Sequence, residues 1–578
     1  MAARTSTIAE DEPFARTRHQ RRVQVTAGKK DEYIIVNRQG IENLFNTSAR
    51  EHLQREALCE GALRLQKTEQ KGLSSSWTLY CDKCNYTSLP QKMYQELNTG
   101  RPGKKPSTLN LALGTGLLNS PIGVTTFREL MLHIGIDPGS ETGLQKIMNK
   151  SGEIVTRLAE ENMADERQKL RQYESVAVAC DARYNNPISS GNSPFQGGSQ
   201  AVFTVTEDMS PEKKVIHVTT ASKLCTRGTR LRSRGENVTC PGHDGCLATL
   251  GAHESIGMEG RYAQQSAEVL KEDKLHVSYV TSDGDSRIIK GFRSALGPQV
   301  QNMKDQRHFS LAQKRLTSQT NFSVAMFPGT KKTYERHRKW FAEDLRIRCT
   351  AELTSAIKSC NHISPPTSKK EHLCTLLAST PQAIIACYKG NCDLCMQHSF
   401  VCDALGGKSW RKTFVPRGLQ EKMEMTPGDE GLLHELILRR LGPEAISVTY
   451  LNSDTQKVEA MNRAYSKTNP KTVTSVRNFK ARVSAAVLTN NAGFDGASRL
   501  TRAATFHAVS EDINRKISQV ERRRQSRKAH GKTFAAKKSR AVTRAAKYQL
   551  YEEKNQAAPS DSYKTGIDLY PGPSAISQ

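Results

Sequence analysis

Two aspartates lie at the ends of predicted apolar strands, where their carboxylates could bind a metal ion. Asp181 lies at the end of SVAVACDA (175–182), and Asp283 ends HVSYVTSD (276–283). Adjacent carboxylates repel each other unless a cation lies between them, and Mg²⁺ or Mn²⁺ prefers such hard oxygen ligands. Two such ions can activate a water and stabilise the leaving oxygen of a phosphodiester. For either acid alone a turn or a helix cap is the simpler interpretation, and Asp285, just before a predicted helix, is the better candidate for a cap.

Two further polar segments follow along the chain. Asp305 and His308 form a D-x-x-H arrangement directly after the last predicted strand. Glu459 lies near the start of a predicted helix, with Asn462 and Arg463 at i+3 and i+4, so that all three share one face. A lone glutamate on a helix is more often solvated than catalytic, so these residues gain meaning only from their surroundings.

The elements that would position these acids alternate between strands and helices. Apolar, β-branched runs predict strands, and apolar residues at i, i+3 and i+4 predict helices. The strands are 175–182, 200–208, 213–222, 276–283 and 299–305, and the helices are GMEGRYAQQSAEVLKE, SRIIKGFRSAL and FSLAQKRL. Three strands, helix, strand, helix, strand, helix is an α/β pattern that suits an RNase H-like mixed sheet flanked by helices. In such a sheet the first and fourth strands are neighbours, which would bring Asp181 and Asp283 side by side.

Most of the 14 cysteines gather in three groups. The N-terminus has no apolar signal segment, so disulfides are not expected and clustered cysteines indicate zinc first. A structural Zn²⁺ takes four Cys or His ligands in a tetrahedron. The groups are Cys59, Cys81 and Cys84; Cys225, Cys240, His243 and Cys246; and Cys387, Cys392, Cys395, His398 and Cys402, which offers five candidates for four places. The alternative is reduced, partly buried cysteine acting as a small apolar side chain.

The composition describes a large basic protein. With 578 residues the chain is too long for one core, so we expect two to four domains. It has 85 Lys and Arg against 58 Asp and Glu, a formal charge of +27 that favours a long polyanion as partner. A soluble protein with basic tails is the alternative. No run of about 18 apolar residues occurs, so neither a transmembrane helix nor a membrane partner is expected.

A basic segment near the C-terminus is the main candidate for contact with DNA phosphates. Between Arg515 and Lys547 there are 13 Lys or Arg and one acid, Glu521. We expect a helix that lies along phosphates, and a nuclear localisation signal in the same residues. Aromatic residues are sparse, which disfavours base stacking, and a solvated disordered tail is the alternative. The side chains assigned to DNA are Arg522, Arg523, Arg524, Arg527, Lys528, Lys537, Lys538 and Arg540.

The predicted organisation follows these changes of composition and period. Seven regions are expected: a disordered basic N-terminus (1–30), an N-terminal region with a candidate zinc site (31–100), a helical region (109–172), the first part of the core (173–330), a helical insertion with a Cys-rich zinc segment (331–450), helices that carry Glu459 (451–510), and a basic helix with a disordered tail (511–578).

Several motifs, in this order, resemble one protein family. SDGDSRIIKGF, the K-D-Q-R-H-F-x-x-x-Q-K-R pattern at 304–315, and TQKVEAMNRA followed by NPK together look like the Mutator-like superfamily of DNA transposases. GMEGRYAQQSAEVL also resembles the segment between that family's third and fourth strands. The likeness runs roughly from residue 30 to 500, and it rests on the order and spacing of the motifs together.

The resemblance implies an RNase H-like core with a DDE triad, interrupted before the last acid by a helical insertion. Carried over position by position, the triad is Asp181, Asp283 and Glu459, which would hold two Mg²⁺ or Mn²⁺ ions. Asp305 and His308 match the C/DxxH motif of such transposases, which would support the active site or the handling of target DNA.

The chain departs from that family in two places. Many relatives have D-G-T-W after the first acid, whereas Asp181 is followed here by Ala182, Arg183 and Tyr184. Relatives also have an earlier C-x2-C pair, of which only Cys59 remains. The first zinc site is therefore expected to lack a Cys ligand.

The function implied is that of a Mutator-like transposase. It would bind double-stranded DNA at inverted repeats, cut with metal-activated water, and let the exposed 3′-hydroxyl attack target DNA. It would act as a homo-oligomer in the nucleus. The alternative is a catalytically decayed, domesticated transposase that acts as a zinc-dependent DNA-binding protein. A weaker third hypothesis is an RNase H-like nuclease of other purpose.

Overall fold

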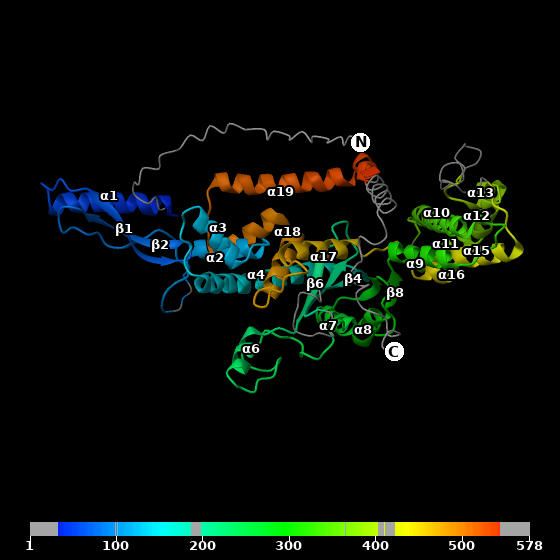
Figure 1. Cartoon of the computed structure of the whole chain (residues 1–578), viewed down its shortest axis with the longest axis horizontal. Helices are drawn as coiled ribbons and strands as arrows, with labels where there is room; N and C mark the ends of the chain where they lie inside the picture. The colour runs from blue at the N-terminus through cyan, green and yellow to red at the C-terminus, as the bar shows by residue number, and fades with distance from the viewer. Residues whose placement is uncertain are drawn as a thin grey trace, which may run out of the picture.

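The computed structural model describes residues 33–98, 100, 102–185, 198–363, 366–402, 410, 422–540 and 542–543. In these residues the chain is an elongated mixture of helices and two β-sheets (Figure 1). The smaller sheet lies toward one end, a group of helices lies at the other, and the larger sheet lies between them. The segments expected to be disordered, 1–30 and the residues from about 553 onward, lie outside the described residues.

An antiparallel sheet and one helix form the N-terminal region. The elements are α1 (Arg38–Arg55), β1 (Leu63–Lys71), β2 (Ser74–Cys81) and β3 (Gln91–Lys92), and the strands pair in sequence order. Leu44 of α1 packs against Trp77, Leu79 and Met93, so that the helix lies against the sheet. Burial of these apolar side chains stabilises the contact, as expected for a helix with one apolar face.

Long helices connect the N-terminal region with the larger sheet. They are α2 (Thr108–Leu118), α3 (Val124–His133), α4 (Glu141–Leu170) and, much later in the chain, α18 (Phe479–Thr505). The backbones of α4 and α18 approach closely at Gly152, where an added Cβ would lie 2.9 Å from the Cβ of Ala481. Glycine is therefore required at this crossing, because any side chain would push the two helices apart.

The larger sheet has the strand order β6-β5-β4-β7-β8. Its strands are β4 (Val176–Tyr184), β5 (Gln200–Glu207), β6 (Val215–Ser222), β7 (Val277–Ser282) and β8 (Gln301–Lys304). β4 pairs with β5, and β5 with β6, in antiparallel fashion, whereas β4–β7 and β7–β8 are parallel. All five predicted strands are present, and the first and fourth are neighbours as expected.

Helices cover both faces of the larger sheet. They are α7 (Glu259–Glu272) and α8 (Ser286–Leu296) on one face, and α17 (Gln456–Thr468) with α18 on the other. Successive residues of a strand point to opposite faces. Phe203 accordingly packs with Phe292 of α8, whereas its neighbour Val202 packs with Met461 of α17. The core therefore has two layers, with the sheet between them.

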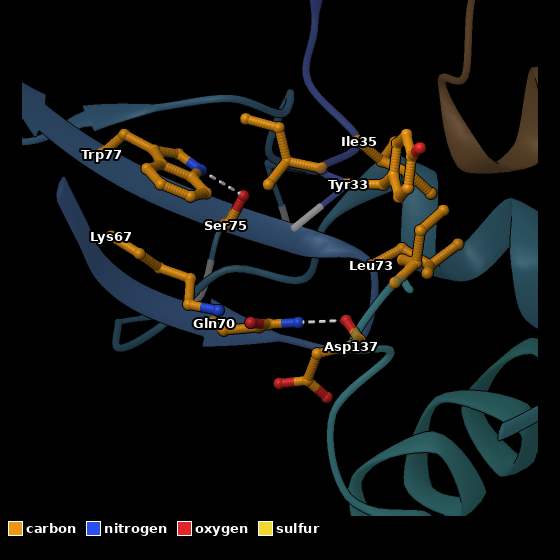
Figure 2. Close-up of a pocket in the computed structure, with 10 residues that line it drawn as sticks. Tyr33, Ile35, Lys67, Gln70, Leu73, Ser75, Trp77 and Asp137 are labelled. Carbon is orange, nitrogen blue, oxygen red and sulfur yellow. Dashed lines mark hydrogen bonds between the residues drawn. The ribbon is translucent and has the colours of Figure 1, made fainter. Parts of the chain in front are cut away.

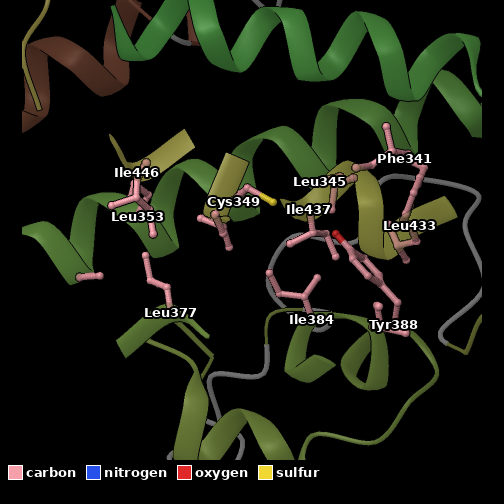
Figure 3. Close-up of a cluster of buried hydrophobic side chains, with 14 of the residues drawn as sticks. Phe341, Leu345, Cys349, Leu353, Leu377, Ile384, Tyr388, Leu433, Ile437 and Ile446 are labelled. Atoms are coloured by element: carbon pink, nitrogen blue, oxygen red, sulfur yellow. The ribbon is translucent and has the colours of Figure 1, made fainter. Parts of the chain in front are cut away.

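A group of helices is inserted between β8 and α17. It comprises α9 (Gln306–Gln319), α10 (Lys331–Ser359), α11 (Pro366–Leu377), α12 (Thr380–Tyr388), α13 (Asp393–His398), α15 (Pro427–Leu441) and α16 (Pro443–Ser447). Buried side chains such as Phe341, Tyr388 and Ile437 form its core (Figure 3). The backbone N–H of Lys304 in β8 donates to the carbonyl of Val448 at 2.8 Å. The chain therefore returns beside the strand from which it left, and α17 can reach the larger sheet.

Two further helices lie outside these layers. Helix α6 (Thr226–Ser233) belongs to a long excursion between β6 and α7, and α19 (Glu511–Lys532) packs against α18 (Figure 1). Among the helices in the described part of the chain, none is both long and apolar enough to cross a membrane.

Candidate active site and metal centres

Two acids from neighbouring parallel strands lie at one edge of the larger sheet. Asp181 belongs to β4, and Asp283 directly follows β7. Ala179 pairs with Thr281 in the register of these strands, and each acid lies two residues farther along its own strand. The same ends of parallel strands meet at one sheet edge, so the two carboxylates are brought to the same place.

Asp181 is half-buried, and the charges of three other acids act on it. Its Oδ2 accepts a hydrogen bond from the side-chain amide of Asn462 in α17 at 2.9 Å. Burial raises the pKa of Asp181 to about 7, and the negative charges of Asp283, Glu259 and Glu459 add to this rise. Acids that raise the pKa of one another are stabilised when a cation neutralises them. The donor set, oxygen only and partly exposed, therefore fits Mg²⁺ or Mn²⁺.

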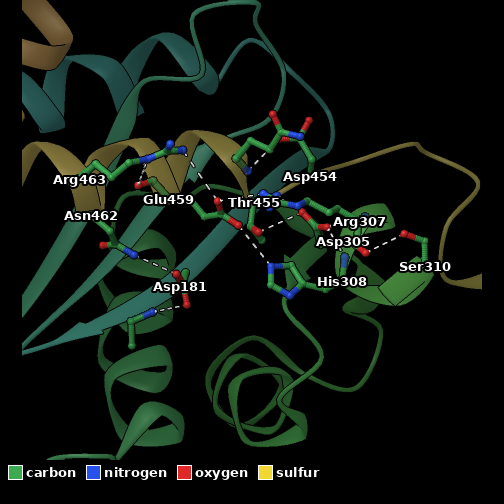
Figure 4. Close-up of polar contacts among 12 residues, drawn as sticks. Asp181, Asp305, Arg307, His308, Ser310, Asp454, Thr455, Glu459, Asn462 and Arg463 are labelled. Atoms are coloured by element: carbon green, nitrogen blue, oxygen red, sulfur yellow. Dashed lines mark hydrogen bonds and ion pairs between the residues drawn. The ribbon is translucent and has the colours of Figure 1, made fainter. Parts of the chain in front are cut away.

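Glu459 lies in the first turn of α17 and faces three basic side chains (Figure 4). Its Oε1 is 3.3 Å from Nε2 of His308, and its Oε2 is 3.5 Å from Nη1 of Arg307. Arg463, one turn later in α17, is 3.9 Å from the same Oε2. The predicted D-x-x-H segment and the predicted acid of α17, about 150 residues apart in sequence, are therefore in direct contact.

The side chain of Asp305 accepts hydrogen bonds from the first residues of two helices, α9 and α17. Its Oδ1 accepts the backbone N–H groups of Arg307 and His308 at 2.7 and 2.9 Å, which caps α9. Its Oδ2 accepts the backbone N–H and the hydroxyl of Thr455, at the start of α17, at 2.7 and 3.0 Å. Burial alone would raise the pKa of Asp305, but the hydrogen bonds from Thr455 and His308 outweigh it and the pKa is lowered. The carboxylate thus fixes the start of α17 four residues before Glu459.

Asp285 is a helix cap, as the sequence predicts. Its side chain accepts the backbone N–H of Arg287 at 2.8 Å at the start of α8, and it also pairs with the guanidinium of Arg287. This pairing with Arg287 lowers the pKa of Asp285 to about 2. Gly284 between the two acids has φ +114°, a backbone conformation that favours glycine. Asp283 and Asp285 are therefore separated by a turn and have different partners.

The two residues after Ala182 connect β4 to the helices on both faces of the sheet. Arg183 is buried and donates to the hydroxyl of Ser466 in α17 at 3.1 Å. The hydroxyl of Tyr184 donates to Oε1 of Glu259 in α7 at 2.6 Å. Sequence reasoning missed Glu259, whose charge acts on Asp181, because nothing in its local pattern distinguishes it from a helix-start acid. Asn462 was placed on the face of Glu459, but its bond to Asp181 could not be foreseen.

The first cysteine group gains a fourth ligand that sequence reasoning missed. Cys59, Cys81 and Cys84 gather with His52 of α1, and the four ligand atoms lie within 4.8 Å of one another. The sulfurs of Cys59 and Cys81 are 3.6 Å apart, close to the edge of about 3.8 Å expected for a zinc tetrahedron. His52 replaces the missing Cys ligand, because packing of α1 on the small sheet brings its last turn to the end of β2.

The second cysteine group is assembled as expected from Cys225, Cys240, His243 and Cys246. Cys225 lies at the start of α6, and its sulfur is 3.3 Å from Nε2 of His243. The other ring nitrogen of His243, Nδ1, is 3.0 Å from the carbonyl of Asp244. A hydrogen bond at Nδ1 leaves Nε2 free as the ligand atom, the arrangement common to zinc-bound histidines.

The third cysteine group uses four of its five candidates. Cys387, Cys392, Cys395 and Cys402 lie within 4.8 Å of one another, and His398 is not part of this group. Four thiols complete a tetrahedron, so the fifth candidate has no place in it. The backbone N–H of Trp410 donates a hydrogen bond to the sulfur of Cys402 at 3.2 Å. All three groups could therefore hold zinc.

The predicted DNA-binding side chains lie on α19 and in the helical residues 534–540 that follow it. The described part of this segment is exposed, with no buried residue in α19. Arg524 differs from its neighbours because its guanidinium lies 4.3 Å from the ring centre of Phe494 in α18. The segment forms a helix, whereas its alternative interpretation was a disordered tail.

A small pocket lies in the N-terminal region, away from Asp181 and Asp283 (Figure 2). Its walls include Trp77, Gln70 and Asp137. The indole N–H of Trp77 donates to the hydroxyl of Ser75 at 2.6 Å, and the amide of Gln70 donates to the carbonyl of Asp137. These polar groups already have partners within the chain, so we assign no function to the pocket.

A comparison with models of known protein families gives a match. The family model described as Mutator-like transposase matches residues 32–402, well over half of the chain. The matched range includes Asp181, Asp283, Asp305 and His308, and it ends at Cys402 before Glu459. No curated protein matches this chain.

Proposed function

Because the chain belongs to the Mutator-like transposase family, a family of nucleic-acid-processing enzymes, we propose that it is a metal-dependent DNA transposase. It cleaves the ends of its element and joins them to target DNA. The observation that carries the proposal is that the charges of Asp283 and Glu459 act on Asp181, while Asn462 links α17 to Asp181.

The strand arrangement supports an RNase H-like core. Three antiparallel strands, extended on the β4 side by two parallel ones, agree with that fold, as do helices on both faces. The acids belong to the first and fourth strands, and the third acid comes from a helix after the insertion. This is the order in which the family resemblance implies a DDE triad.

The residues at this site have two kinds of role: three acids would bind metal ions, and the neighbouring side chains would hold those acids in place. Asp181, Asp283 and Glu459 would hold two divalent cations. When bound, Mg²⁺ or Mn²⁺ would activate the attacking water or 3′-hydroxyl and stabilise the leaving oxygen. Asn462 orients the carboxylate of Asp181, and His308 with Arg307 holds the carboxylate of Glu459 at the sheet edge.

Cleavage of a DNA substrate that carries the element's ends tests the proposal. Asp181→Asn, Asp283→Asn and Glu459→Gln should each abolish cleavage, by at least about 100-fold, with DNA binding retained. Asp165→Asn, an exposed change in α4, is the matched control and should cleave like the parent protein. Full cleavage by Asp283→Asn would exclude the assignment.

The alternative is a DNA-binding protein that has lost cleavage. It is favoured by the segment after Asp181, in which Arg183 and Tyr184 replace the residues typical of relatives and make structural contacts instead. The same assay separates the two functions. Specific binding of the element's ends by the parent protein, without cleavage in Mg²⁺ or Mn²⁺, would favour the alternative.

Further parts of the proposal concern assembly and location. The three Cys and His groups would hold structural zinc, because each provides four ligands and none leaves an open coordination position. Pairing two element ends requires at least two subunits, so we propose a homo-oligomer on double-stranded DNA. The basic C-terminal segment would direct the protein to the nucleus.

A further inference from the structure

Helix α18 is broken at Gly493, and the break is filled by α19. Gly493 has φ +75° and ψ 168°, which interrupts the helical hydrogen bonding. The backbone N–H of the next residue, Phe494, donates instead to Oε2 of Glu521 in α19 at 2.9 Å. A Cβ added to Gly493 would lie 3.2 Å from the carboxylate of Glu521, so glycine leaves the room that this contact needs.

Three more contacts hold the same face of α19. The guanidinium of Arg524 lies over the ring of Phe494, and the hydroxyl of Ser518 donates to Asp495 at 3.2 Å. Nearer the start of α19, Asn514 accepts a hydrogen bond from Arg502. Residues 514, 518, 521 and 524 recur at helical spacing, so they share one side of α19, which we call the docked face.

The opposite side of α19 carries unpaired positive charge. Lys516, Arg523 and Arg527 are exposed, and within the described residues none has an ion pair or a side-chain hydrogen bond. Lys516, Arg523 and Arg527 lie at i, i+7 and i+11, one above another along about 16 Å of helix. We call these three residues the outer stripe. Like charges kept together without partners indicate an anionic ligand with regularly spaced charges.

We propose that Glu521 is a positioning residue: it docks α19 on α18 so that the outer stripe faces the phosphates of duplex DNA. This inference rests on the proposed function, because it takes DNA as the partner. Glu521 is the one acid between Arg515 and Lys547, where a carboxylate facing phosphate would be repelled. Its contact with Phe494 explains why an acid stands there, since the carboxylate faces α18 and not the DNA.

The two roles open to Glu521 predict opposite changes in DNA affinity. If it were only an unfavourable charge, Glu521→Ala would strengthen DNA binding, because one repulsion is removed. If it docks the helix, the same change weakens binding, because the cations of the outer stripe are no longer presented together. Glu511→Ala, at an exposed position in the first turn of α19, removes the same charge and is the matched control.

The experiment measures binding of the full chain to a 30-base-pair duplex at several salt concentrations by fluorescence anisotropy. The triple change Lys516→Gln, Arg523→Gln and Arg527→Gln should reduce the slope of log K against log salt by about 2.7, at about 0.9 for each lost phosphate contact. Lys271→Gln, Lys274→Gln and Lys290→Gln, exposed on the α7 and α8 side, should leave the slope within about 0.5 of the parent.

Glu521→Ala should reduce the slope by at least about 1, whereas Glu511→Ala should bind as tightly as the parent or more tightly. Hydrogen exchange at the amide of Phe494 should be faster in Glu521→Ala and unchanged in Glu511→Ala. Equal or tighter DNA binding by Glu521→Ala, or unchanged exchange at Phe494, overturns the positioning role. A parent protein that does not bind duplex DNA refutes the proposed function, while exchange at Phe494 still decides whether Glu521 docks the helix.

Discussion

The side-chain amide of Asn462 donates a hydrogen bond to the carboxylate of Asp181 at 2.9 Å, although 281 residues separate them. This bond joins α17, which follows the helical insertion, to β4, which precedes it. Glu459 lies one turn before Asn462 in α17. The bond therefore brings Glu459 toward the sheet edge where β7 ends and Asp283 follows. The candidate site is thus assembled from three distant parts of the chain.

Asn462→Ala should lower DNA cleavage without lowering DNA binding. A hydrogen bond to a charged group contributes about 1.5–3 kcal/mol, and each 1.4 kcal/mol in the barrier is about tenfold in rate, so a loss of roughly tenfold or more is expected. Single-turnover cleavage rates measure it. Asn361→Ala, an exposed change in the helical insertion, should have no effect. Parent-like cleavage by Asn462→Ala would show that Asp181 is oriented by other groups.

Asp305→Asn should disturb the active site through the start of α17. An amide nitrogen at the position of Oδ2 would face the N–H of Thr455, leaving a buried donor unpaired at a cost of roughly 2 kcal/mol. We expect a lower melting temperature and at least about tenfold slower cleavage. Thr455→Ser keeps both donors and is the conservative control. If Asp305→Asn melted and cleaved like the parent, the link between α9 and α17 would not position Glu459.

His52→Ala should remove one zinc ion from each chain, because His52 supplies the fourth ligand to Cys59, Cys81 and Cys84. The parent is expected to contain three zinc ions, measured by elemental analysis of the purified protein after dialysis. His398→Ala is the matched control and should still contain three, because four cysteines complete the third group. Loss of zinc in His398→Ala, with full zinc in His52→Ala, would reverse this ligand assignment.

His217 should make the fold sensitive to mild acid. Burial, assisted by the positive charge of Arg167, lowers the pKa of His217 to about 4. Histidine in the unfolded chain titrates near 6.5, so below that pH the unfolded chain binds a proton that the folded chain excludes. The stability contributed by neutral His217 is therefore present above pH 6.5 and is lost as the pH falls toward 4, by at most about 1.4 kcal/mol for each pH unit.

Thermal melting between pH 7.5 and 4.5 checks this prediction. His217→Gln, which cannot be protonated, should lose less stability over that range than the parent, whereas His362→Gln, at an exposed position, should follow the parent. Identical pH profiles for the parent and His217→Gln would mean that acid acts on the fold through other groups.

Much of the local structure could be predicted from the sequence, because it depends on short-range patterns. The five strands of the larger sheet follow from apolar, β-branched runs, and the cap at Asp285 follows from its place before an amphipathic helix. The short spacing between cysteines likewise predicted three groups of candidate zinc ligands. A strand, a helix cap and a single cysteine knuckle each involve residues a few positions apart, for which spacing and geometry are nearly equivalent.

Contacts between distant elements were decided only by the tertiary structure. His52 has no zinc-binding pattern of its own and becomes a candidate ligand because α1 packs on the small sheet. In the sequence, Glu521 is one acid among many cations. Its partner, the backbone N–H of Phe494, is available only because α18 is broken at Gly493. The sequence by itself identified most of the candidate metal ligands, and it predicted the side chains that would contact DNA. Which of them meet was decided by helix packing, since burial of apolar faces sets the positions of the polar residues that those helices carry.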